Sequence, residues 1–253
     1  MFRVVIPARF GSTRLPGKVL LPLAGKPMLR WVYERACASA ASEVIIATDD
    51  SRIVEAAGGF AGQIAMTASN HPSGTDRIAQ VARERRWNDA DIVVNVQADE
   101  PLIPSAIIAQ VARVLENDPR AALATLATPI TSAEEYLDTN AVKVVLDAQG
   151  RALYFSRAPV PWDRDGGSAT PPRFNFTGAL RHVGIYGYRV AALHAITALP
   201  PGSLERRESL EQLRALENGL TWHVALASEP PGPDVNTAED LQRAERLLAQ
   251  RIA

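Results

Sequence analysis

Short apolar segments alternate with amphipathic ones along the first hundred residues, and this alternation constrains the fold more than any other feature. Strands are expected from Val4, over Glu43–Thr48 and over Ile64–Thr67, with helices between them. A further segment, 91–96, is apolar almost without interruption, which is typical of a strand buried on both faces. The order therefore predicts a parallel sheet with helices on both faces and ligands at the carboxyl ends of its strands.

The pattern changes after Ala141. Two strand-like runs lie on either side of Gln149-Gly150, which indicates a hairpin rather than a crossover. A strand over Arg181–Tyr188, a helix over Leu204–Asn218 and a last strand over Thr221–Ala227 are expected after it. The sequence thus predicts an α/β fold with a mixed, mostly parallel central sheet.

The composition is that of a globular chain. With 253 residues, 47% of them hydrophobic and 22% charged, the chain can bury a core of its own, and we expect one domain, 1–253. A net charge of -1 gives no overall attraction to nucleic acid or to anionic membranes, and no apolar run approaches membrane-spanning length. The single cysteine, Cys37, fits a reducing cytoplasm, where we expect the protein.

The loop after the first strand carries three cations, Arg9, Arg14 and Lys18, together with two glycines. Such a loop is a common way to hold phosphates. It is not a P-loop, because five residues rather than four separate its glycines and no hydroxyl residue follows Lys18. Three cations favour a triphosphate over a single phosphate, and a solvated basic loop is the less favoured alternative.

Two adjacent acids, Asp99 and Glu100, follow the segment 91–96. Acids at the carboxyl end of a central strand cost free energy unless they meet water or a cation. Asp99 is therefore the candidate Mg²⁺ ligand, since Mg²⁺ prefers one or two carboxylates plus phosphate oxygens. Glu100 is expected to have a structural role.

Two further polar segments are candidates for binding. The loop Ser69–Arg77 opens a helix whose start is marked by Ser73 or Thr75, and a helix N-terminus can bind an anion or a base edge. The alternative is that Thr75 is only a cap and Arg77 a surface charge. Further along, His182 and Tyr186 share one face of a strand and can line a pocket, although a lone histidine is more often structural.

The motifs as a set resemble those of the 3-deoxy-manno-octulosonate (Kdo) cytidylyltransferases, and the resemblance covers nearly the whole chain. In chain order they are IPARFGSTRLPGK, ATDD, HPSGTDR, NVQADEP, YFSRAPVPWDRD, LRHVGIYGY and LEQLRALENG. The first motif is shared with other nucleotidylyltransferases, including those for sialic acid. YFSRA, RHVGIYGYR and LEQLR are far narrower signals.

The resemblance implies a nucleotidylyltransferase fold of the glycosyltransferase-A type. It also implies transfer of CMP from CTP to Kdo, giving CMP-Kdo and pyrophosphate for lipopolysaccharide synthesis, by direct attack of the anomeric hydroxyl on the α-phosphorus. A homodimer is implied as well, with 141–220 contributing the sugar-binding and dimerisation part. By position, the resemblance assigns the triphosphate to Arg9, Ser12, Arg14 and Lys18, and the cytidine to Ala8, Ser73, Thr75 and Arg77. It assigns the sugar to Gln97, Arg157, His182, Tyr186, Glu211 and Gln212. Mg²⁺ is assigned to Asp99, and the catalytic candidates are Lys18, Arg14 and Asp99.

The chain departs from the family pattern at two positions. Ala98 stands where the family usually has glycine, which is tolerable only if the backbone there does not need a positive φ. Asn236 stands where the family typically has an aspartate that helps to bind the metal, and an amide oxygen supplies no negative charge. Asp234, two residues earlier, faces the same side if the segment is extended, so we hypothesise that its carboxylate compensates.

Two alternative functions stay open. One is a nucleotidylyltransferase for a related substrate, such as amino-Kdo, a sialic acid or a sugar 1-phosphate. The other is a non-catalytic nucleotide-binding paralogue, for which Ala98 and Asn236 are the only support, while the retained cations and Asp99 weigh against it.

Overall fold

The parallel part of the sheet is built by the N-terminal residues. The structure is a computed structural model that describes residues 1–11, 15–168 and 173–252. Strand β1 (Phe2–Ala8) lies at the centre of this part, with β4 (Glu43–Thr48) on one side and β6 (Ile92–Asn95) on the other, both parallel to it. Strand β5 (Ile64–Met66) extends the sheet beyond β4. The predicted parallel arrangement is confirmed.

The other part of the sheet is mixed, as the hairpin after Ala141 predicted. Strand β10 (Leu180–Arg189) runs antiparallel to β6 and to β7 (Leu123–Pro129), and β11 (Trp222–Leu226) is parallel to β7. The full order is β11-β7-β10-β6-β1-β4-β5. The hairpin β8 (Lys143–Leu146) and β9 (Ala152–Ser156) joins through β8 to the end of β10.

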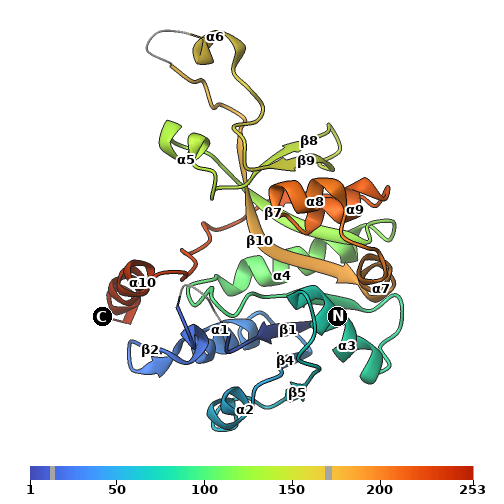
Figure 1. Ribbon diagram of the computed structural model, residues 1–253, viewed down its shortest axis with the longest axis vertical. Helices are drawn as coiled ribbons and strands as arrows, with labels where there is room; N and C mark the ends of the chain where they lie inside the picture. Colours follow the sequence, from blue (N-terminus) through green and yellow to red (C-terminus); the bar gives the residue numbers. More distant parts are fainter. Residues whose placement is uncertain (12–14, 169–172, 253) are drawn as a thin grey trace.

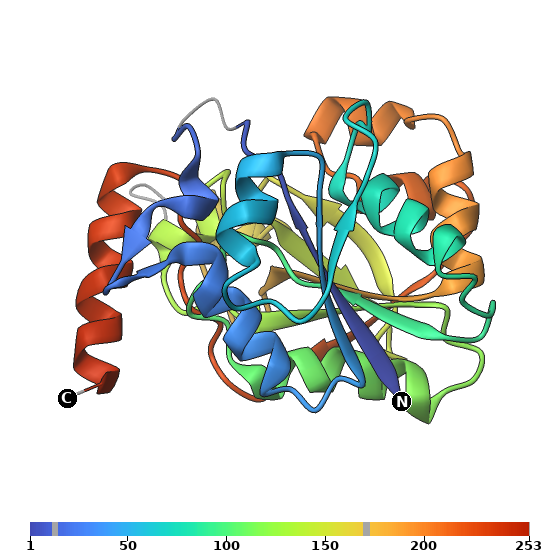
Figure 2. The same cartoon turned by 90° about the horizontal axis from the view of Figure 1, so that it is seen from below.

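Helices cover both faces of the sheet (Figures 1 and 2). The side chains of β1 alternate between two cores: Val4 and Ile6 pack with helices α1 (Met28–Cys37), α2 (Ser51–Ala57) and α4 (Ser105–Asn117). Val5 packs on the other face with helices α3 (Gly74–Glu84), α7 (Val190–Ala198) and α9 (Gln212–Glu217). This period of two along strands that are buried on both sides is the physical basis of the three-layer arrangement.

The predicted helix over Leu204–Asn218 is wrong as a single element. It is divided into α8 (Ser203–Glu208) and α9 by Ser209, whose φ of 53° and ψ of 48° are left-handed. A left-handed residue ends a helix, so the chain turns there. As a result, Glu211 and Gln212 lie at the start of a second helix and line a hollow of the surface.

Several short elements lie outside the main sheet. The opening loop leads into a short 3-10 helix (Lys18–Leu20) and the two-stranded sheet of β2 (Pro22–Leu23) and β3 (Lys26–Pro27). Helices α5 (Ala133–Leu137) and α6 (Arg164–Gly167) lie on the end of the molecule that projects upward in Figure 1. None of the helices in the described residues is both long and apolar enough to cross a membrane.

The segment between β11 and the last helix, α10 (Ala238–Ile252), runs past the carboxyl end of β6. It is held there by a hydrogen bond from Val235 N to Asp99 O (2.9 Å). Gly232 allows a close approach, because a Cβ at this position would lie 2.3 Å from the Cβ of Leu102. This segment, 229–237, is called the strap below.

Candidate active site

The Lys18 ammonium group is surrounded by oxygen atoms that come from three separate parts of the chain. Its Nζ donates to Asp99 Oδ2 at 2.5 Å, to Asn236 Oδ1 at 3.1 Å and to the carbonyl oxygen of Val235 at 3.2 Å. The Lys18 side chain is only 15% exposed and that of Asp99 25%, so the ion pair is partly withdrawn from water. Lys18, Asp99 and the strap thus meet at the carboxyl edge of the sheet, as predicted for the first two.

The local backbone explains the position of Lys18. Gly17 has a φ of 67° and its N–H donates to the carbonyl oxygen of Phe10 (3.1 Å), which closes the opening loop. The 3-10 helix begins at the next residue and directs Lys18 inward. Arg9 is exposed. The predicted phosphate ligands Ser12 and Arg14 lie outside the described residues.

Asp234 and Asn236, which were expected to face the same side, are in direct contact. The Asn236 amide donates from Nδ2 to Asp234 Oδ2 and accepts from Lys18 with Oδ1. A capping box follows: Thr237 N donates to Asp240 Oδ2 (2.9 Å), and Asp240 N donates to Thr237 Oγ1 (3.2 Å). The start of α10 therefore fixes the strap and, with it, the two side chains beside Lys18.

Ala98 fits its place without backbone strain. Four non-glycine residues have a positive φ in the described part of the chain, and Ala98 is not among them. Its methyl group is buried. The condition under which alanine can replace glycine next to Asp99 is therefore met.

Acidic side chains gather next to the Lys18 contacts, and one of them, Glu100, is largely protonated at neutral pH. Burial raises the pKa of Glu100 to about 8, and the charges of Asp99 and Asp234 add to this rise. Within the described residues, no group of three or more His, Cys, Asp or Glu side chains is arranged to hold a metal ion. The oxygen atoms around Lys18 Nζ nevertheless already surround a cation, the lysine ammonium group. They are carboxylate, amide and carbonyl oxygens, which are the ligand types that Mg²⁺ accepts.

A cleft of three adjoining hollows lies beside this cluster. The first hollow, about 260 Å³, includes Pro7, Arg9, Ser73 and Arg77. The second, about 250 Å³, adjoins the first through Gly74 and Gln97. The third, about 230 Å³, adjoins the second through Tyr186, Leu210 and Gln212. The cleft therefore runs from the end of β1 to the middle of β10.

The first hollow contains the start of α3. Ser73 is the N-cap, with its hydroxyl accepting from Asp76 N at 3.2 Å, so the cap is Ser73 and not Thr75. Arg77 is buried rather than a surface charge: it pairs with Asp49 (3.2 Å) and donates to the Thr67 hydroxyl. Its guanidinium group is thus held in a fixed orientation at the wall of the first hollow.

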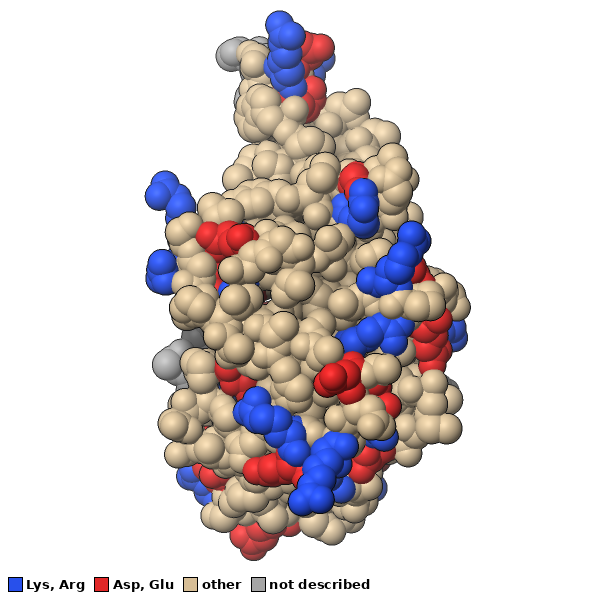
Figure 3. All heavy atoms as spheres, turned by 90° about the vertical axis from the view of Figure 1, so that its right-hand side faces the viewer, with Lys and Arg blue, Asp and Glu red and all other residues tan. Residues whose placement is uncertain are grey.

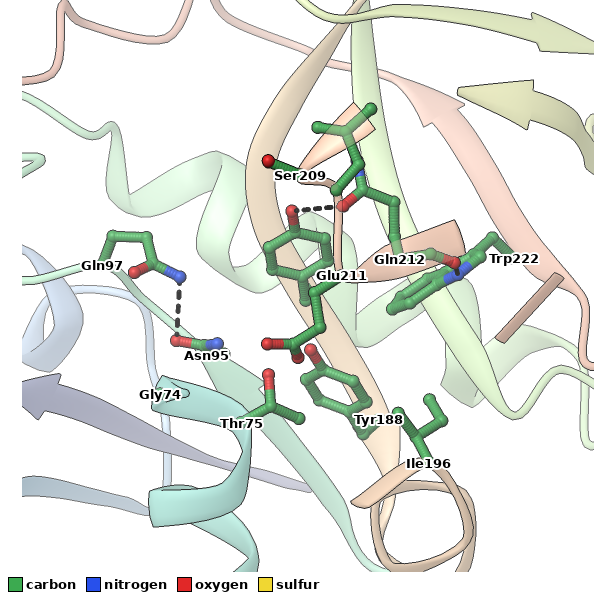
Figure 4. A pocket seen from close by; sticks show the side chains of 12 residues that line it. Gly74, Thr75, Asn95, Gln97, Tyr188, Ile196, Ser209, Glu211, Gln212 and Trp222 are labelled. Atoms are coloured by element: carbon green, nitrogen blue, oxygen red, sulfur yellow. Dashed lines mark hydrogen bonds between the residues drawn. The ribbon is translucent and has the colours of Figure 1, made fainter. Parts of the chain in front are cut away.

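The second hollow joins α3 to the junction of α8 and α9 (Figure 4). The Glu211 carboxylate points at the Thr75 hydroxyl in this view, and the Ser73 hydroxyl donates to Asp76 Oδ2 at 2.7 Å. Burial raises the pKa of Glu211, while these hydroxyls oppose the rise. Gln97 donates to Asn95 Oδ1 at 3.3 Å on the opposite wall.

The third hollow contains His182, which is buried. Its Nε2 lies 2.9 Å from the Thr125 hydroxyl, and its ring packs 5.4 Å from that of Tyr186 and 4.9 Å from that of Phe155. Burial lowers the pKa of His182 to about 3, so the ring is neutral at physiological pH. Tyr186 donates to Gln212 Oε1 at 3.5 Å. The predicted shared face of His182 and Tyr186 is therefore real, although the register of β10 against β7 shifts between Val183 and Tyr186.

Arg157 lies apart from the three hollows. Its Nε donates to the carbonyl oxygen of Glu208 (2.7 Å) and its Nη1 to that of Thr139 (2.9 Å). Its backbone N–H donates to Glu208 Oε2 (2.9 Å). The guanidinium group thus ties the end of β9 to α8, and a sugar contact for Arg157 stays a prediction.

Sequence analysis missed several residues of the cleft: Asn95, Arg181, Tyr188, Leu210 and Trp222. Asn95 could have been found from the sequence, because it is a polar side chain inside an otherwise apolar strand. Tyr188 had the period of two that singled out His182 and Tyr186. The indole N–H of Trp222 donates to the carbonyl oxygen of Gln212 (2.9 Å), ten residues earlier, a contact that no periodic pattern reveals.

Comparison with known proteins agrees with this geometry. A family model described as Cytidylyltransferase matches residues 3–224. A 3-deoxy-manno-octulosonate cytidylyltransferase of Thioalkalivibrio sulfidiphilus is 54% identical over 247 residues, covering 98% of each chain. One of Marinobacter nauticus is 53% identical over 252 residues, covering 98% of this chain and 97% of the relative. The chain belongs to the 3-deoxy-manno-octulosonate cytidylyltransferases.

Solved structures extend the likeness of this cytidylyltransferase to three dimensions. A structure of CMP:2-keto-3-deoxy-manno-octonic acid synthetase complexed with CTP has a TM-score of 0.89 and 41% sequence identity, covering 99% of this chain and all of that one. A cytidylyltransferase from Leptospira borgpetersenii has a TM-score of 0.60 at 18% identity, which indicates a shared fold alone. The expected mixed α/β nucleotidylyltransferase fold is confirmed.

Proposed function

We propose that this cytidylyltransferase transfers CMP from CTP to Kdo, releasing pyrophosphate. The observation that carries the proposal is the Lys18–Asp99 pair beside three hollows that share lining residues with one another. Transfer of a nucleotidyl group mainly requires fixed positions and charge neutralisation, and a protein nucleophile is not needed. The anomeric hydroxyl of the sugar attacks the α-phosphorus of CTP directly, and pyrophosphate is the leaving group.

The N-terminal half of the cleft supplies the nucleotide contacts in this proposal. Arg9 and Lys18, with Ser12 and Arg14, hold the triphosphate, and Lys18 offsets charge as pyrophosphate leaves. Ala8, Ser73, Thr75 and Arg77 hold the cytidine; the capped start of α3 and the fixed Arg77 support this part. The C-terminal half holds the sugar through Gln97, His182, Tyr186, Glu211 and Gln212, with Arg157 as a further candidate.

Mg²⁺ is the proposed cofactor. Asp99 would hold it, with Asn236 contributing an amide oxygen and Asp234 the second carboxylate of the site. The ion would neutralise charge on the triphosphate. The contacts of Lys18 with Asp99 and Asn236 support this assignment, because they bring two of these oxygen donors to one point.

One assay tests the proposal against its alternatives: pyrophosphate release from CTP with Kdo, amino-Kdo, a sialic acid and a sugar 1-phosphate, each with and without Mg²⁺. Release with CTP and Kdo alone, dependent on Mg²⁺, is expected. Release with another acceptor instead of Kdo would move the assignment to that related substrate. No release with any pair would favour a non-catalytic nucleotide-binding paralogue.

Dimerisation, location in the cytoplasm and the single-domain organisation belong to the same proposal. The family resemblance implies a homodimer, and the arm that carries α6 extends from the body (Figure 1) with Trp162 54% exposed, which makes it the candidate contact surface. Light scattering on the purified chain should give the mass of two protomers, and Trp162→Asp should shift the mass toward one. A monomeric wild type would overturn the dimer.

The visible surface charge agrees with small-molecule substrates. On the face drawn in Figure 3, positive and negative side chains lie among one another, and neither sign forms a continuous field. A nucleic-acid-binding protein usually presents a basic stripe. No contact with nucleic acid is proposed.

A further inference from the structure

We propose that Arg181, rather than Arg157, binds the carboxylate of the acid sugar and so selects an acid over a neutral sugar. The inference rests on the proposed function, because it names a specificity residue for that reaction. It starts from the third hollow, whose charged lining residues are Arg181, Glu100 and Asp234. A substrate carboxylate in this hollow lies beside the acidic side chain of Asp234, so it needs a cationic partner there.

Apart from the Mg²⁺ proposed beside Asp234, the other candidates at this end of the cleft do not supply that cation. His182 lines the hollow but is neutral, because burial lowers its pKa to about 3. Arg157 does not line the hollow, and its guanidinium group already donates to the carbonyl oxygens of Glu208 and Thr139. Arg157 would have to give up both bonds to reach a substrate.

Arg181 has the position and the open donors that the role requires. Its backbone is fixed between two strands, opposite Thr128 of β7 and Lys143 of β8. Its Nε lies 2.7 Å from Glu135 Oε1, without the geometry of a hydrogen bond. Within the described part of the chain, its two terminal amino groups donate no hydrogen bond, so they are free to bind both oxygens of one carboxylate.

Glu135 orients Arg181 from outside the hollow. It lies in the first turn of α5, where its own N–H donates to Ser132 Oγ (3.1 Å) and its Oε2 accepts from Thr131 N (3.3 Å). Glu135 does not line the third hollow. Its carboxylate therefore holds the Nε edge of Arg181, which leaves the far edge for a ligand.

Equilibrium binding separates the role of Arg181 from turnover. The dissociation constants of Kdo and of its C1 carboxamide are measured by calorimetry, in the presence of Mg²⁺ and a non-hydrolysable CTP analogue, for wild type, Arg181→Gln, Arg181→Lys and Arg157→Gln. Wild type should prefer the acid roughly 10- to 100-fold, the range of a charge-assisted hydrogen bond. Arg181→Gln should abolish this preference while binding the carboxamide as well as wild type does, and Arg181→Lys should restore part of it.

The contrary outcomes are distinct. The inference is overturned if Arg181→Gln keeps the preference, if Arg157→Gln alone loses it, or if wild type shows none. Thermal unfolding of each variant checks that the fold is retained. Pyrophosphate release by wild type from CTP and Kdo tests the proposed function separately, so failure of one does not imply failure of the other.

Discussion

Lys18 is the residue on which the proposed chemistry depends most. Its ammonium group connects the opening loop, the end of β6 and the strap through Asp99, Asn236 and Val235. Removing one fixed donor to a developing negative charge typically costs about 10²- to 10³-fold in rate. Lys18→Met should therefore lower kcat for pyrophosphate release by this order.

Lys26→Met is the matched control for that variant. Lys26 is also a partly exposed lysine in an ion pair, with Glu34 at 2.8 Å, but it lies on β3 outside the cleft. Its loss should leave kcat near the wild-type value. Equal losses in the two variants would show that Lys18 acts only on stability, which unfolding curves would reveal independently.

Asn236 and Asp234 give a second prediction at this scale. If Asp234 supplies the carboxylate that Asn236 lacks, Asp234→Ala should raise the Mg²⁺ concentration for half-maximal rate roughly tenfold, the size of a typical loss around a metal ligand. Asn236→Asp should lower it, because it adds a negative charge beside Asp99. An unchanged Mg²⁺ dependence in Asp234→Ala would eliminate the compensation, and no change or a rise in Asn236→Asp would remove the metal role of residue 236.

Single residues could be predicted from the sequence where their environment depends on a short spacing or on a backbone rule. Asp234 and Asn236 were expected to face the same side because they are two residues apart, and the condition on φ that was set for Ala98 is met in the structure. The burial of Arg77 was not predictable, because its partners Asp49 and Thr67 come from two other segments. The position of Arg181 in the third hollow was not predictable either, because it depends on how the strap lies against β10.

At the scale of elements, the N-cap of α3 has two effects that can be separated. Ser73 accepts from Asp76 N at 3.2 Å, and Ser132, the N-cap of α5, accepts from Glu135 N at 3.1 Å. Alanine at either position should lower the free energy of unfolding by about 1 kcal/mol. Only Ser73 lines the first hollow, so only Ser73→Ala should also raise KM for CTP.

Urea unfolding and CTP titrations of the two serine variants check this prediction. A higher KM for CTP in Ser132→Ala, or an unchanged one in Ser73→Ala, would separate α3 from nucleotide binding. The lower free energies of unfolding of the two variants would then reflect only the loss of the helix caps.

Most elements could be predicted because their apolar residues repeat with a clear period. The alternation of Val4, Val5 and Ile6 between two cores is a property of the strand itself. The break between α8 and α9 was missed because LERRESLEQLRALEN has a helical period throughout. Ser209 leaves the helix only in the folded chain, where Arg214 forms two hydrogen bonds with Glu205, at 2.8 and 2.5 Å, and fixes the two short helices together.

For the whole molecule, buried His182 predicts a loss of stability in mild acid. Its folded pKa of about 3 lies below the ordinary value of 6.5, so below pH 6.5 the unfolded chain binds a proton that the folded chain does not. The free energy of unfolding should fall by up to about 1.4 kcal/mol per pH unit from pH 6.5 toward pH 3 through this group. His182→Gln removes this pH-dependent contribution, so the difference in the free energy of unfolding between wild type and variant should become smaller as the pH falls. Free energies of unfolding that change in parallel for the two proteins from pH 7.5 to 5 would contradict the prediction.

The architecture of the whole molecule was predictable, and the path of its cleft was not. Apolar strands and amphipathic helices in alternation determine a sheet with two covered faces, whatever the ligand. The cleft forms where β6 ends, β10 runs antiparallel beside it and the strap passes by. Those three segments are residues 92–95, 180–189 and 229–237, far apart in the sequence, and only their packing brings Asp99, His182 and Asp234 together.

The oxygen-lined position of the Lys18 ammonium group has a consequence for the order in which ligands bind. In the free protein, lysine is the counter-ion of Asp99. A magnesium ion that arrives alone must displace it and leave an ammonium group without its carboxylate. When magnesium arrives with a triphosphate, Lys18 can pass to the phosphates as Asp99 passes to the metal, and each charge keeps a partner throughout the exchange. Metal and nucleotide should therefore bind as one cooperative unit.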